Sequence, residues 1–525
     1  MEETAATQPP RGRPEQATIA ALLEVGSDDA PAVGAPEGTR PLPYRELRAL
    51  AHQTVATLNA LGIGRNDRVA IVLPNGPEMA TAFACIGAGA ATAPLNPGYR
   101  AEDVEFYLGD LRAKALVVDA GEEKETPALS VARRLGIPVL ELRRDRDRGA
   151  GAFTLAPRDR MGGALAHGGL AAPDDVALVL HTSGTTSRPK IVPLLQRNLA
   201  ASARHIAGTL ALGPEDVCLN IMPLFHIHGL MAATLASFAA GAQVSCSPGF
   251  NALRFFAWLD EVRPTWYTAV PTMHQAILAR AERHLEVLAR CRLRLVRSSS
   301  ACLPRQVMAE LERTFRAPVI EAYGMTEAAH QMASNPLPPR ARKPGTVGPA
   351  AGPEIAIMDE RGNLLDRGEI GEVVIRGPNV TSGYASDPEA NAAAFTDGWF
   401  HTGDQGVLDA EGYLRLTGRL RELINRGGEK ISPLEIDEAL MHHPAVQQVV
   451  AFGMPHEQLG EEVAAAVVLR EGQHATEREL REFAATRLIH FKVPRKIVIV
   501  TEIPKGATGK LQRIGLAAKL GVAGG

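Results

Sequence analysis

The stretch TWYTAVPTMHQAILARA, residues 265–281, joins a short apolar run to an amphipathic one. Its first six residues, 265–270, predict a strand, and the spacing of the apolar residues that follow predicts a helix. Pro271 would stand in the first turn of that helix, where proline is well tolerated. A strand followed directly by a helix is the unit from which parallel sheets covered by helices are built.

The same unit recurs along the chain. DRVAIVLP (67–74) predicts a buried strand, and a helix-like run follows it at 77–90. RLRLVR (292–297) and PVIEAY (318–323) are further short apolar strands, each ending in a polar loop. The sequence therefore predicts an α/β fold with parallel sheets, in which ligands sit at the loops beyond the carboxyl ends of the strands.

The pattern of predicted strands and helices changes twice after this region. From about residue 352 short strands and turns predict a small β subdomain, and from Gly418 a small α+β unit begins. Two helix starts in that last unit carry capping-box patterns, Ser432 with Glu435 and Thr476 with Glu479. We expect a disordered tail at 1–15, a large N-terminal domain at 16–417, a hinge at 418–422 and a small C-terminal domain at 423–525.

Composition excludes several classes of function. The 525 residues carry a formal net charge of −3 at pH 7 and no block of lysine and arginine, which argues against nucleic acid as a partner. No apolar run is long enough to cross a membrane. The five cysteines are scattered without a CxxC pair, so we expect reduced thiols and a cytoplasmic protein. We expect either a monomer or a homodimer.

The loop HTSGTTSRPK (181–190) is suited to phosphate binding. It follows an apolar run and contains five hydroxyl residues, one glycine and two cations, with no carboxylate. It lacks the second glycine and the terminal GK[ST] of a Walker A loop, so an ordinary P-loop NTPase is a poor fit. Hydroxyl and backbone donors with Lys190 could still hold a polyanion, although alone the stretch would pass for a solvated turn.

Four more motifs follow in order: EAYGMTE (321–327), HTGD (401–404), GRLRELI (418–424) and PKGATGK (504–510). With the loop they resemble, from about residue 40 to about 515, the adenylate-forming superfamily. Its members include acyl-CoA synthetases, nonribosomal-peptide adenylation domains and beetle luciferases. PLFHIHGL, RSSSA, MTEAAHQMASNP and INRGGEKISP look most like the oxalate–CoA ligase branch, as does Ser187 in place of the usual glycine.

The resemblance implies a site for ATP. Thr326 would contact phosphate, and Glu327 would bind Mg²⁺, since a carboxylate beside phosphates needs a hard cation between them. Tyr323 would stack on adenine, and Asp404 would accept both ribose hydroxyls with Arg419 beside it. The residues implied for ATP or AMP are Thr182, Ser183, Gly184, Thr185, Thr186, Ser187, Lys190, Ser300, Ala301, Cys302, Glu321, Ala322, Tyr323, Gly324, Asp404 and Arg419.

Lys510 would carry the first half-reaction. When a carboxylate attacks the α-phosphate, two anions meet, and a lysine that bridges them stabilises the developing charge. The second half-reaction needs no protein nucleophile, because coenzyme A supplies the thiol. By resemblance the small domain rotates about Arg421 and withdraws Lys510. It then brings to the pantetheine channel Arg426, Gly427, Gly428 and Glu429.

The acid itself is indicated by polar residues near the expected acyl pocket. Oxalate needs such a pocket, because its far carboxylate would otherwise be buried unpaired. His226, Ser298, Ser300 and His330 lie where the resemblance places the acyl group, and a charged histidine would add an ion pair. We expect His228 only to support the loop. His226 also belongs with Lys510, Thr326 and Glu327 to the expected catalytic set.

Other functions stay open at this point. The acid could be malonate, an aryl acid or a short-chain acid. The chain could load a separate carrier protein, although it stops about fifteen residues after Lys510 with no carrier domain. It could also be a non-catalytic nucleotide-binding protein, which would be expected to lose Lys510, Glu327 or Asp404; all three are present.

Overall fold

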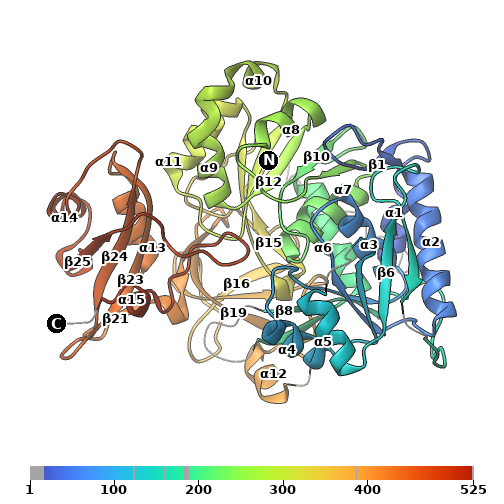
Figure 1. Ribbon diagram of the computed structural model, residues 1–525. Coiled ribbons are helices and arrows are strands. Elements are labelled where there is room, and N and C mark those ends of the chain that lie inside the picture. The colour runs from blue at the N-terminus through green and yellow to red at the C-terminus, as the bar shows by residue number, and fades with distance from the viewer. Residues whose placement is uncertain (1–16, 122–124, 159–160, 183–188, 386, 523–525) are drawn as a thin grey trace, which may run out of the picture.

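The computed structural model (Figure 1) describes residues 17–121, 125–158, 161–182, 189–385 and 387–522. The expected tail, residues 1–15, lies outside these ranges. The described residues form two large sheets that are mainly parallel, a small antiparallel β unit and a C-terminal α+β unit. The predicted α/β class and its division into one large and two smaller units are therefore confirmed.

The first large sheet positions most of the loops discussed below. Within the described residues its eight strands run in the order β15-β14-β13-β12-β10-β11-β1-β2. From β14 across to β1 neighbours are parallel, and the edge strands β15 and β2 pair antiparallel. The carboxyl ends of β12, β13 and β14 therefore meet at one edge, where ligands bind in such sheets. The strands are β1 (Pro31–Gly34), β2 (Leu42–Pro43), β10 (Val217–Asn220), β11 (Gln243–Cys246), β12 (Trp266–Ala269), β13 (Leu295–Ser298), β14 (Val319–Met325) and β15 (His330–Ser334).

The second large sheet carries the base of the predicted phosphate loop. Its order is β7-β6-β5-β3-β4-β8-β9 among the described residues. β8 and β9 form an antiparallel hairpin, and the loop 182–190 joins them. The strands are β3 (Arg68–Val72), β4 (Ala91–Pro94), β5 (Ala115–Asp119), β6 (Val139–Arg144), β7 (Phe153–Pro157), β8 (Val176–His181) and β9 (Ile191–Leu195).

Two helices lie between the large sheets. α3 contacts β4 of one sheet and β11 of the other, and α6 contacts β8 and β15. α3 is buried from Met79 to Gly87, as expected for a helix that is apolar on all sides. No helix of the described ranges is long and apolar enough to span a bilayer. The helical segments of this unit are α1 (Ile19–Leu23), α2 (Tyr44–Ala60), α3 (Pro77–Gly87), α4 (Ala101–Leu111), α5 (Pro127–Leu135), α6 (Gln196–Thr209), η2 (His228–Leu235), α7 (Ala236–Ala239), α8 (Phe255–Val262), α9 (Pro271–Ala281), η3 (Glu282–His284), α10 (Leu285–Arg290), α11 (Arg305–Phe315) and η4 (Thr326–Ala328).

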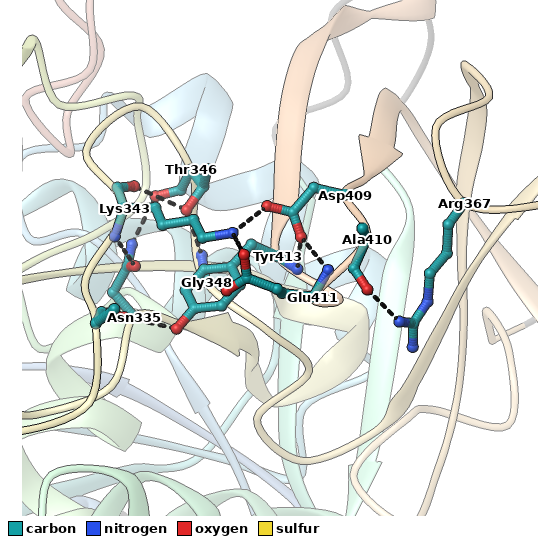
Figure 2. Close-up of polar contacts among 10 residues, drawn as sticks. Asn335, Lys343, Thr346, Gly348, Arg367, Asp409, Ala410, Glu411 and Tyr413 are labelled. Carbon is teal, nitrogen blue, oxygen red and sulfur yellow. Dashed lines mark hydrogen bonds and ion pairs between the residues drawn. The ribbon is translucent and has the colours of Figure 1, made fainter.

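A polar cluster around Lys343 is one of the contacts that join the small β unit to the first sheet. Figure 2 shows the ammonium of Lys343 directed at Asp409, 2.6 Å away, and Glu411 lies 3.0 Å from it. Lys343 also lies over the ring of Tyr413 at 4.3 Å. Asn335, directly after β15, accepts from the Lys343 backbone, which orders the loop that carries Lys343. Its elements are β16 (Glu354–Met358), β17 (Gly371–Arg376), α12 (Pro388–Ala394), β18 (Phe395–Thr396), β19 (Trp399–Leu408) and β20 (Leu414–Arg419).

The C-terminal unit is a five-stranded sheet with helices α13 and α14. Thr476 and Glu479 form the predicted capping box at the start of α14. Ser432 does not cap α13; its hydroxyl donates to the carbonyl of Thr417 in β20, so that prediction is corrected. The elements are η5 (Leu420–Glu422), β21 (Ile424–Arg426), β22 (Glu429–Ile431), α13 (Pro433–Met441), β23 (Val446–His456), β24 (Gly460–Leu469), α14 (Glu477–Ala485), η6 (His490–Lys492), β25 (Lys496–Ile499) and α15 (Leu516–Lys519).

Candidate active site

Tyr323, Asp404 and Arg419 form a polar cluster where the β unit meets β14. The Tyr323 hydroxyl donates to Asp404 Oδ2 over 2.5 Å, and Arg419 Nε lies 3.2 Å from Asp404 Oδ1. Asp404 and Arg419 are direct partners across β19 and β20. Burial raises the pKa of Asp404, and the guanidinium of Arg419 opposes that rise. A buried carboxylate beside an aromatic ring and a cation can accept hydrogen bonds from a hydroxyl-bearing ligand.

Glu327 is a second buried carboxylate, 6% exposed, in the short helix η4 that Thr326 begins. Tyr384 donates from its hydroxyl to Glu327 Oε1 at 3.0 Å, and Lys190 Nζ lies 4.5 Å from the centre of the Tyr384 ring. Burial raises the pKa of Glu327. The sequence motifs pointed to Glu327 and Lys190 but missed Tyr384, which connects them and stands outside every motif.

Lys510 reaches these carboxylates from the C-terminal unit. The carbonyl of the residue before it accepts from Thr272 Oγ1 at 2.7 Å, so the loop 504–510 contacts the first turn of α9. In Figure 1 this dark red loop extends towards the N-terminal unit. Burial and the nearby Arg419 lower the pKa of Lys510 to about 8, while Asp404 and Glu327 oppose that change. The ammonium and both carboxylates thus share one electrostatic site.

Beyond Lys510 lies a cluster of histidines. The rings of His228 and His330 stack with their centres 4.9 Å apart and their planes inclined by 25°. His228 Nδ1 is 3.0 Å from Ser300 Oγ, and its Nε2 is 2.6 Å from Thr268 Oγ1. His226 Nδ1 accepts from the backbone N–H of His228 at 3.3 Å. His226, Ser300 and His330 therefore converge, and His228 is a central member of the cluster rather than only a support.

Arg297 is a member of the cluster that the sequence reasoning missed. It is 0% exposed, and its Nη1 lies 3.2 Å from His330 Nε2 and 3.4 Å from His228 Nε2. Its Nη2 donates to Gln331 Oε1 at 3.3 Å, and its Nε has no partner. No carboxylate of the described ranges pairs with it. Burying an unpaired charge costs several kcal/mol, and a bound anion would offset that cost.

A signal for Arg297 does exist in the sequence. In RLRLVR (292–297) Arg297 alternates with its neighbours in the same way as Leu293 and Leu295. Alternate residues of a strand face the same side, so Arg297 lies on the side of these two leucines. A cation on the apolar side at the carboxyl end of a strand is unusual and could have been singled out. Burial lowers the pKa of Arg297 to about 9, which leaves it charged at neutral pH.

The three histidines are neutral. Burial and the ammonium of Lys510 lower the pKa of His226 to about 3. Burial first, then neighbouring positive groups that include Arg297, place the pKa values of His228 and His330 well below 6.5. The charged histidine considered from the sequence is therefore contradicted, and the positive charge of this pocket comes from Arg297.

Ser298 does not join the cluster. It follows Arg297 in β13, and successive side chains of a strand point to opposite faces. Its hydroxyl is buried without a hydrogen-bond partner. That Ser298 lines the pocket therefore stays a prediction, while Ser300, in the loop after the strand, contacts His228.

A glycine allows His330 to approach. A Cβ atom on Gly324 would lie 1.7 Å from the carbonyl oxygen of His330, so β15 can pack against β14 here only beside glycine. His330 itself has a φ of +95°, in the left-handed region that non-glycine residues rarely adopt. Such strain is typical of functional positions, and here it turns the ring towards Arg297.

Comparison with known proteins agrees with this geometry. The sequence matches the AMP-binding enzyme family over residues 24–385 and the AMP-binding enzyme C-terminal domain over residues 435–510. The chain belongs to the AMP-binding enzymes.

Several relatives of this AMP-binding enzyme are named for a CoA ligase activity. An oxalate–CoA ligase of Arabidopsis thaliana is 47% identical, over 86% of this chain and 88% of the relative. An oxalate–CoA ligase of Saccharomyces cerevisiae is 41% identical, over 92% and 94%. The crystal structure of ATP-bound MatB from Rhodopseudomonas palustris is 30% identical, covers 94% of this chain and 97% of that one, and superimposes with a TM-score of 0.82.

The remaining residues predicted for the nucleotide come from several loops and strands. Glu321 Oε1 accepts from the backbone N–H of Leu303 at 2.9 Å, and burial raises the pKa of Glu321 to about 8. Thr182 and Lys190 close the base of the phosphate loop through a 2.9 Å backbone hydrogen bond. Ser183, Gly184, Thr185, Thr186 and Ser187 lie outside the described residues. The others are Ala301 and Cys302, exposed in the loop after β13, and Ala322, buried in β14.

The residues predicted to serve coenzyme A lie away from Lys510. Arg421 is in η5, between the β unit and the C-terminal sheet. Arg426 pairs with Glu462 through two contacts of 2.6 and 3.0 Å. Gly427 and Gly428, with φ of +61° and +95°, form the turn to Glu429. Figure 1 shows β21 of this hairpin apart from the dark red loop that extends towards the N-terminal unit of the AMP-binding enzyme.

Proposed function

We propose that this AMP-binding enzyme is an oxalate–CoA ligase. It would join oxalate to coenzyme A at the expense of ATP and release pyrophosphate and AMP. Family membership and the relatives support an AMP-forming acid–CoA ligase that works through an acyl-adenylate. The observation that carries the choice of oxalate is the buried polar cluster of His228, Ser300, His330 and Arg297, because a fatty or aryl acid would require an apolar wall there.

In the first half-reaction one carboxylate of oxalate attacks the α-phosphorus of ATP, and pyrophosphate leaves. We assign to Lys510 the stabilisation of the negative charge that accumulates between the two anions. His226, whose Nδ1 accepts a backbone hydrogen bond, carries its proton on Nε2 and can donate to the reacting carboxylate. Lys510 and His226 come from different domains. The reacting centre is therefore complete only when the C-terminal domain places Lys510 beside His226.

The nucleotide would be held by groups already in place. Tyr323 offers its ring to adenine, and Asp404 offers a carboxylate to the ribose diol. Lys190 and Thr326 would contact the phosphates together with the loop 183–187. Asp404 is already bonded to Tyr323 and Arg419, so ribose binding would need no movement of that side chain.

A divalent cation fits the residues that surround Glu327. No group of three or more metal-ligating side chains gathers in the described part of the chain, which argues against a cage made by protein alone. Mg²⁺ is commonly held by one or two carboxylates together with substrate phosphates. Glu327 is such a lone buried carboxylate, and Tyr384 holds its orientation at 3.0 Å. Bound there, the ion would neutralise phosphate charge.

In the second half-reaction the thiol of coenzyme A attacks the carbonyl carbon of the acyl-adenylate, and AMP leaves. We propose that residues 418–422 are the hinge, and that the unit from 423 onward rotates there. The rotation would withdraw Lys510 and deliver the turn of Gly427 and Gly428, which has no side chain to obstruct a slender pantetheine arm. The free cysteines of the described ranges support a cytoplasmic location. We propose that the enzyme works as a monomer or a homodimer.

The test is a thioester assay with oxalate, malonate, acetate, benzoate and a medium-chain acid, each with ATP, Mg²⁺ and coenzyme A. We expect oxalate to have the highest kcat/KM. A higher value for malonate or benzoate would reject oxalate and leave the ligase chemistry standing. Absence of pyrophosphate release with every acid would instead favour a non-catalytic nucleotide-binding protein.

A further inference from the structure

The unpaired buried guanidinium has a second consequence for the acid site. We propose that Arg297 is a positioning residue: it fixes the tautomers of His228 and His330 so that Ser300 and His330 present hydrogen-bond donors to the second carboxylate of the acid. This proposal rests on the proposed function, because it explains how the same site would recognise a dicarboxylate.

The first step concerns the two Nε2 atoms. A guanidinium has N–H donors and no acceptor. Arg297 Nη1 lies 3.2 Å from Nε2 of His330 and 3.4 Å from Nε2 of His228, so both atoms can offer lone pairs to it. Thr268 Oγ1 accepts from Arg297 Nη1 at 3.4 Å and lies 2.6 Å from Nε2 of His228, to which its hydroxyl can then donate. Because both rings are neutral, each then carries its one proton on Nδ1. One buried cation thereby sets the same tautomer in two stacked rings.

The second step concerns the donors that this tautomer creates. With its proton on Nδ1, His228 donates to Ser300 Oγ at 3.0 Å. The hydrogen of the Ser300 hydroxyl is then free for a ligand, since within the described ranges Ser300 makes no other side-chain hydrogen bond. His330 Nδ1–H likewise has no hydrogen-bond partner among the described residues. Two donors therefore remain unused beside each other, and a carboxylate can accept from both.

The third step concerns charge. Arg297 has no carboxylate partner, and its Nε makes no hydrogen bond. The nearby ammonium of Lys510 adds positive potential and lowers the pKa values of His226, His228 and His330. The second carboxylate of a dicarboxylic acid would compensate the positive charge of Arg297, whereas an uncharged group of the same shape would not. The site should therefore discriminate oxalate from oxamate, in which an amide replaces one carboxylate and its NH₂ meets two donors.

The first experiment compares oxalate and oxamate as substrates for pyrophosphate release, in the wild type and in Arg297→Met. Methionine is unbranched, apolar and flexible enough to occupy much of the same space. We expect the wild type to prefer oxalate by at least about 100-fold, and the variant to lose most of this preference because two hydrogen bonds to a charged acceptor weaken. KM for ATP should not change.

The unfolding temperature separates a positioning role from a structural one. Replacing an unpaired buried charge with an apolar side chain should leave the unfolding temperature of the variant equal to or above that of the wild type. A lower unfolding temperature together with equal loss of both acids would assign Arg297 a structural role and overturn the proposal. An unchanged preference for oxalate in a folded variant would overturn it as well.

A measurement on the wild type covers the case in which the variant does not fold. Long-range proton–nitrogen NMR spectra of the full chain labelled with ¹⁵N-histidine report which ring nitrogen carries the proton. We expect Nδ1–H for His228 and His330 and Nε2–H for His226, with signals assigned by His226→Gln and His330→Gln. An Nε2–H tautomer at His330 would overturn the proposal.

The two failures can be told apart. If the wild type makes no oxalyl-CoA but does make another thioester, the proposed function fails, and the NMR result still decides the tautomers. If the wild type makes oxalyl-CoA and Arg297→Met keeps its preference over oxamate, the proposed function stands and the role of Arg297 is rejected.

Discussion

At the scale of single residues, the site contains charged side chains whose burial shifts their pKa values. Lys510 and Arg297 are cations whose pKa values burial lowers, and Asp404 and Glu327 are carboxylates whose pKa values burial raises. Such shifts cluster where ligands bind, because the folded protein accepts an electrostatic cost that the ligand later removes. ATP and a small dianion would each compensate part of this arrangement.

Substitution of Lys510 should impair the first half-reaction and largely spare the second. We expect Lys510→Ala to reduce acyl-adenylate formation by about 100-fold or more, because an electrostatic stabiliser of developing charge is lost. Thioester formation from a supplied acyl-adenylate should be nearly unaffected, since the proposed second conformation removes Lys510 from the site. Pyrophosphate exchange and thioester release measure the two steps. Equal loss of both would contradict the assignment, and Lys505→Ala, in the same loop, is the matched control.

The pH dependence of adenylation should report the same lysine. The pKa of Lys510 lies at about 8, below its usual 10.5, so the stabilising ammonium is present below pH 8 and lost above it. The kcat/KM for ATP-dependent adenylation should therefore fall above about pH 8 with the slope of one proton. The histidines, with pKa values well below 6.5, should add no change near neutrality. In Lys510→Arg the decline should disappear; its persistence would assign it to another group.

The residues that sequence could predict are those whose role follows from a local motif. Lys510, Asp404 and Glu327 stand in short patterns, and the structure brings them into one site. Arg297 and Tyr384 could not be found in this way. Whether an arginine in a strand is solvated or buried depends on what packs on that face, and here β15 and η2 bring His330 and His228 over it.

At the scale of elements, the sheet edge explains why distant motifs meet. β12, β13 and β14 are parallel neighbours, so the loops after them lie side by side although they are far apart in sequence. This much follows from strand and helix patterns alone. The antiparallel return of β15 does not, because it depends on the close contact at Gly324. A capping box shows the same limit: Thr476 caps its helix, while Ser432 bonds to Thr417 instead.

The contact between β14 and β15 should be intolerant of a side chain. In Gly324→Ala the new Cβ would meet the His330 carbonyl at 1.7 Å, so the strands must separate. We expect a loss of about 3 kcal/mol in the free energy of unfolding of the N-terminal unit and weaker oxalate binding as His330 moves. Thermal unfolding and KM for oxalate check this.

The control for that variant is Gly109→Ala. It lies in α4, where no atom lies within 4 Å of the added Cβ, and alanine favours a helix over glycine by about 1 kcal/mol. Its unfolding temperature should stay level or rise, with KM for oxalate unchanged. If Gly324→Ala behaved like this control, the close approach would be unimportant for the pocket.

At the scale of the whole molecule, polar contacts join the C-terminal unit to helices of the N-terminal unit, among them an ion pair of Arg305 in α11 with Glu438 in α13 at 2.9 Å. Gln275 of α9 donates to the carbonyl of Gln447 at 3.0 Å and accepts from Gln448 at 3.1 Å. Together with Thr272 at the loop of Lys510, these side chains are polar. Polar contacts between domains favour relative motion over permanent association, which agrees with the rotation that we propose about residues 418–422.

A crosslink across these contacts should therefore spare the first half-reaction and slow the second. This is the reverse of the effect expected for Lys510→Ala. We expect Gln275→Cys with Gln448→Cys, joined by a short bis-maleimide, to keep pyrophosphate exchange within a few-fold of the uncrosslinked enzyme. Thioester formation should fall by about 100-fold, because the hinge at 418–422 can no longer turn. Each single cysteine variant treated with the same reagent controls for modification of exposed Cys302. If the crosslinked enzyme still formed thioester at the normal rate, coenzyme A would react without rotation, and the assignment of residues 426–429 to its channel would have to be abandoned.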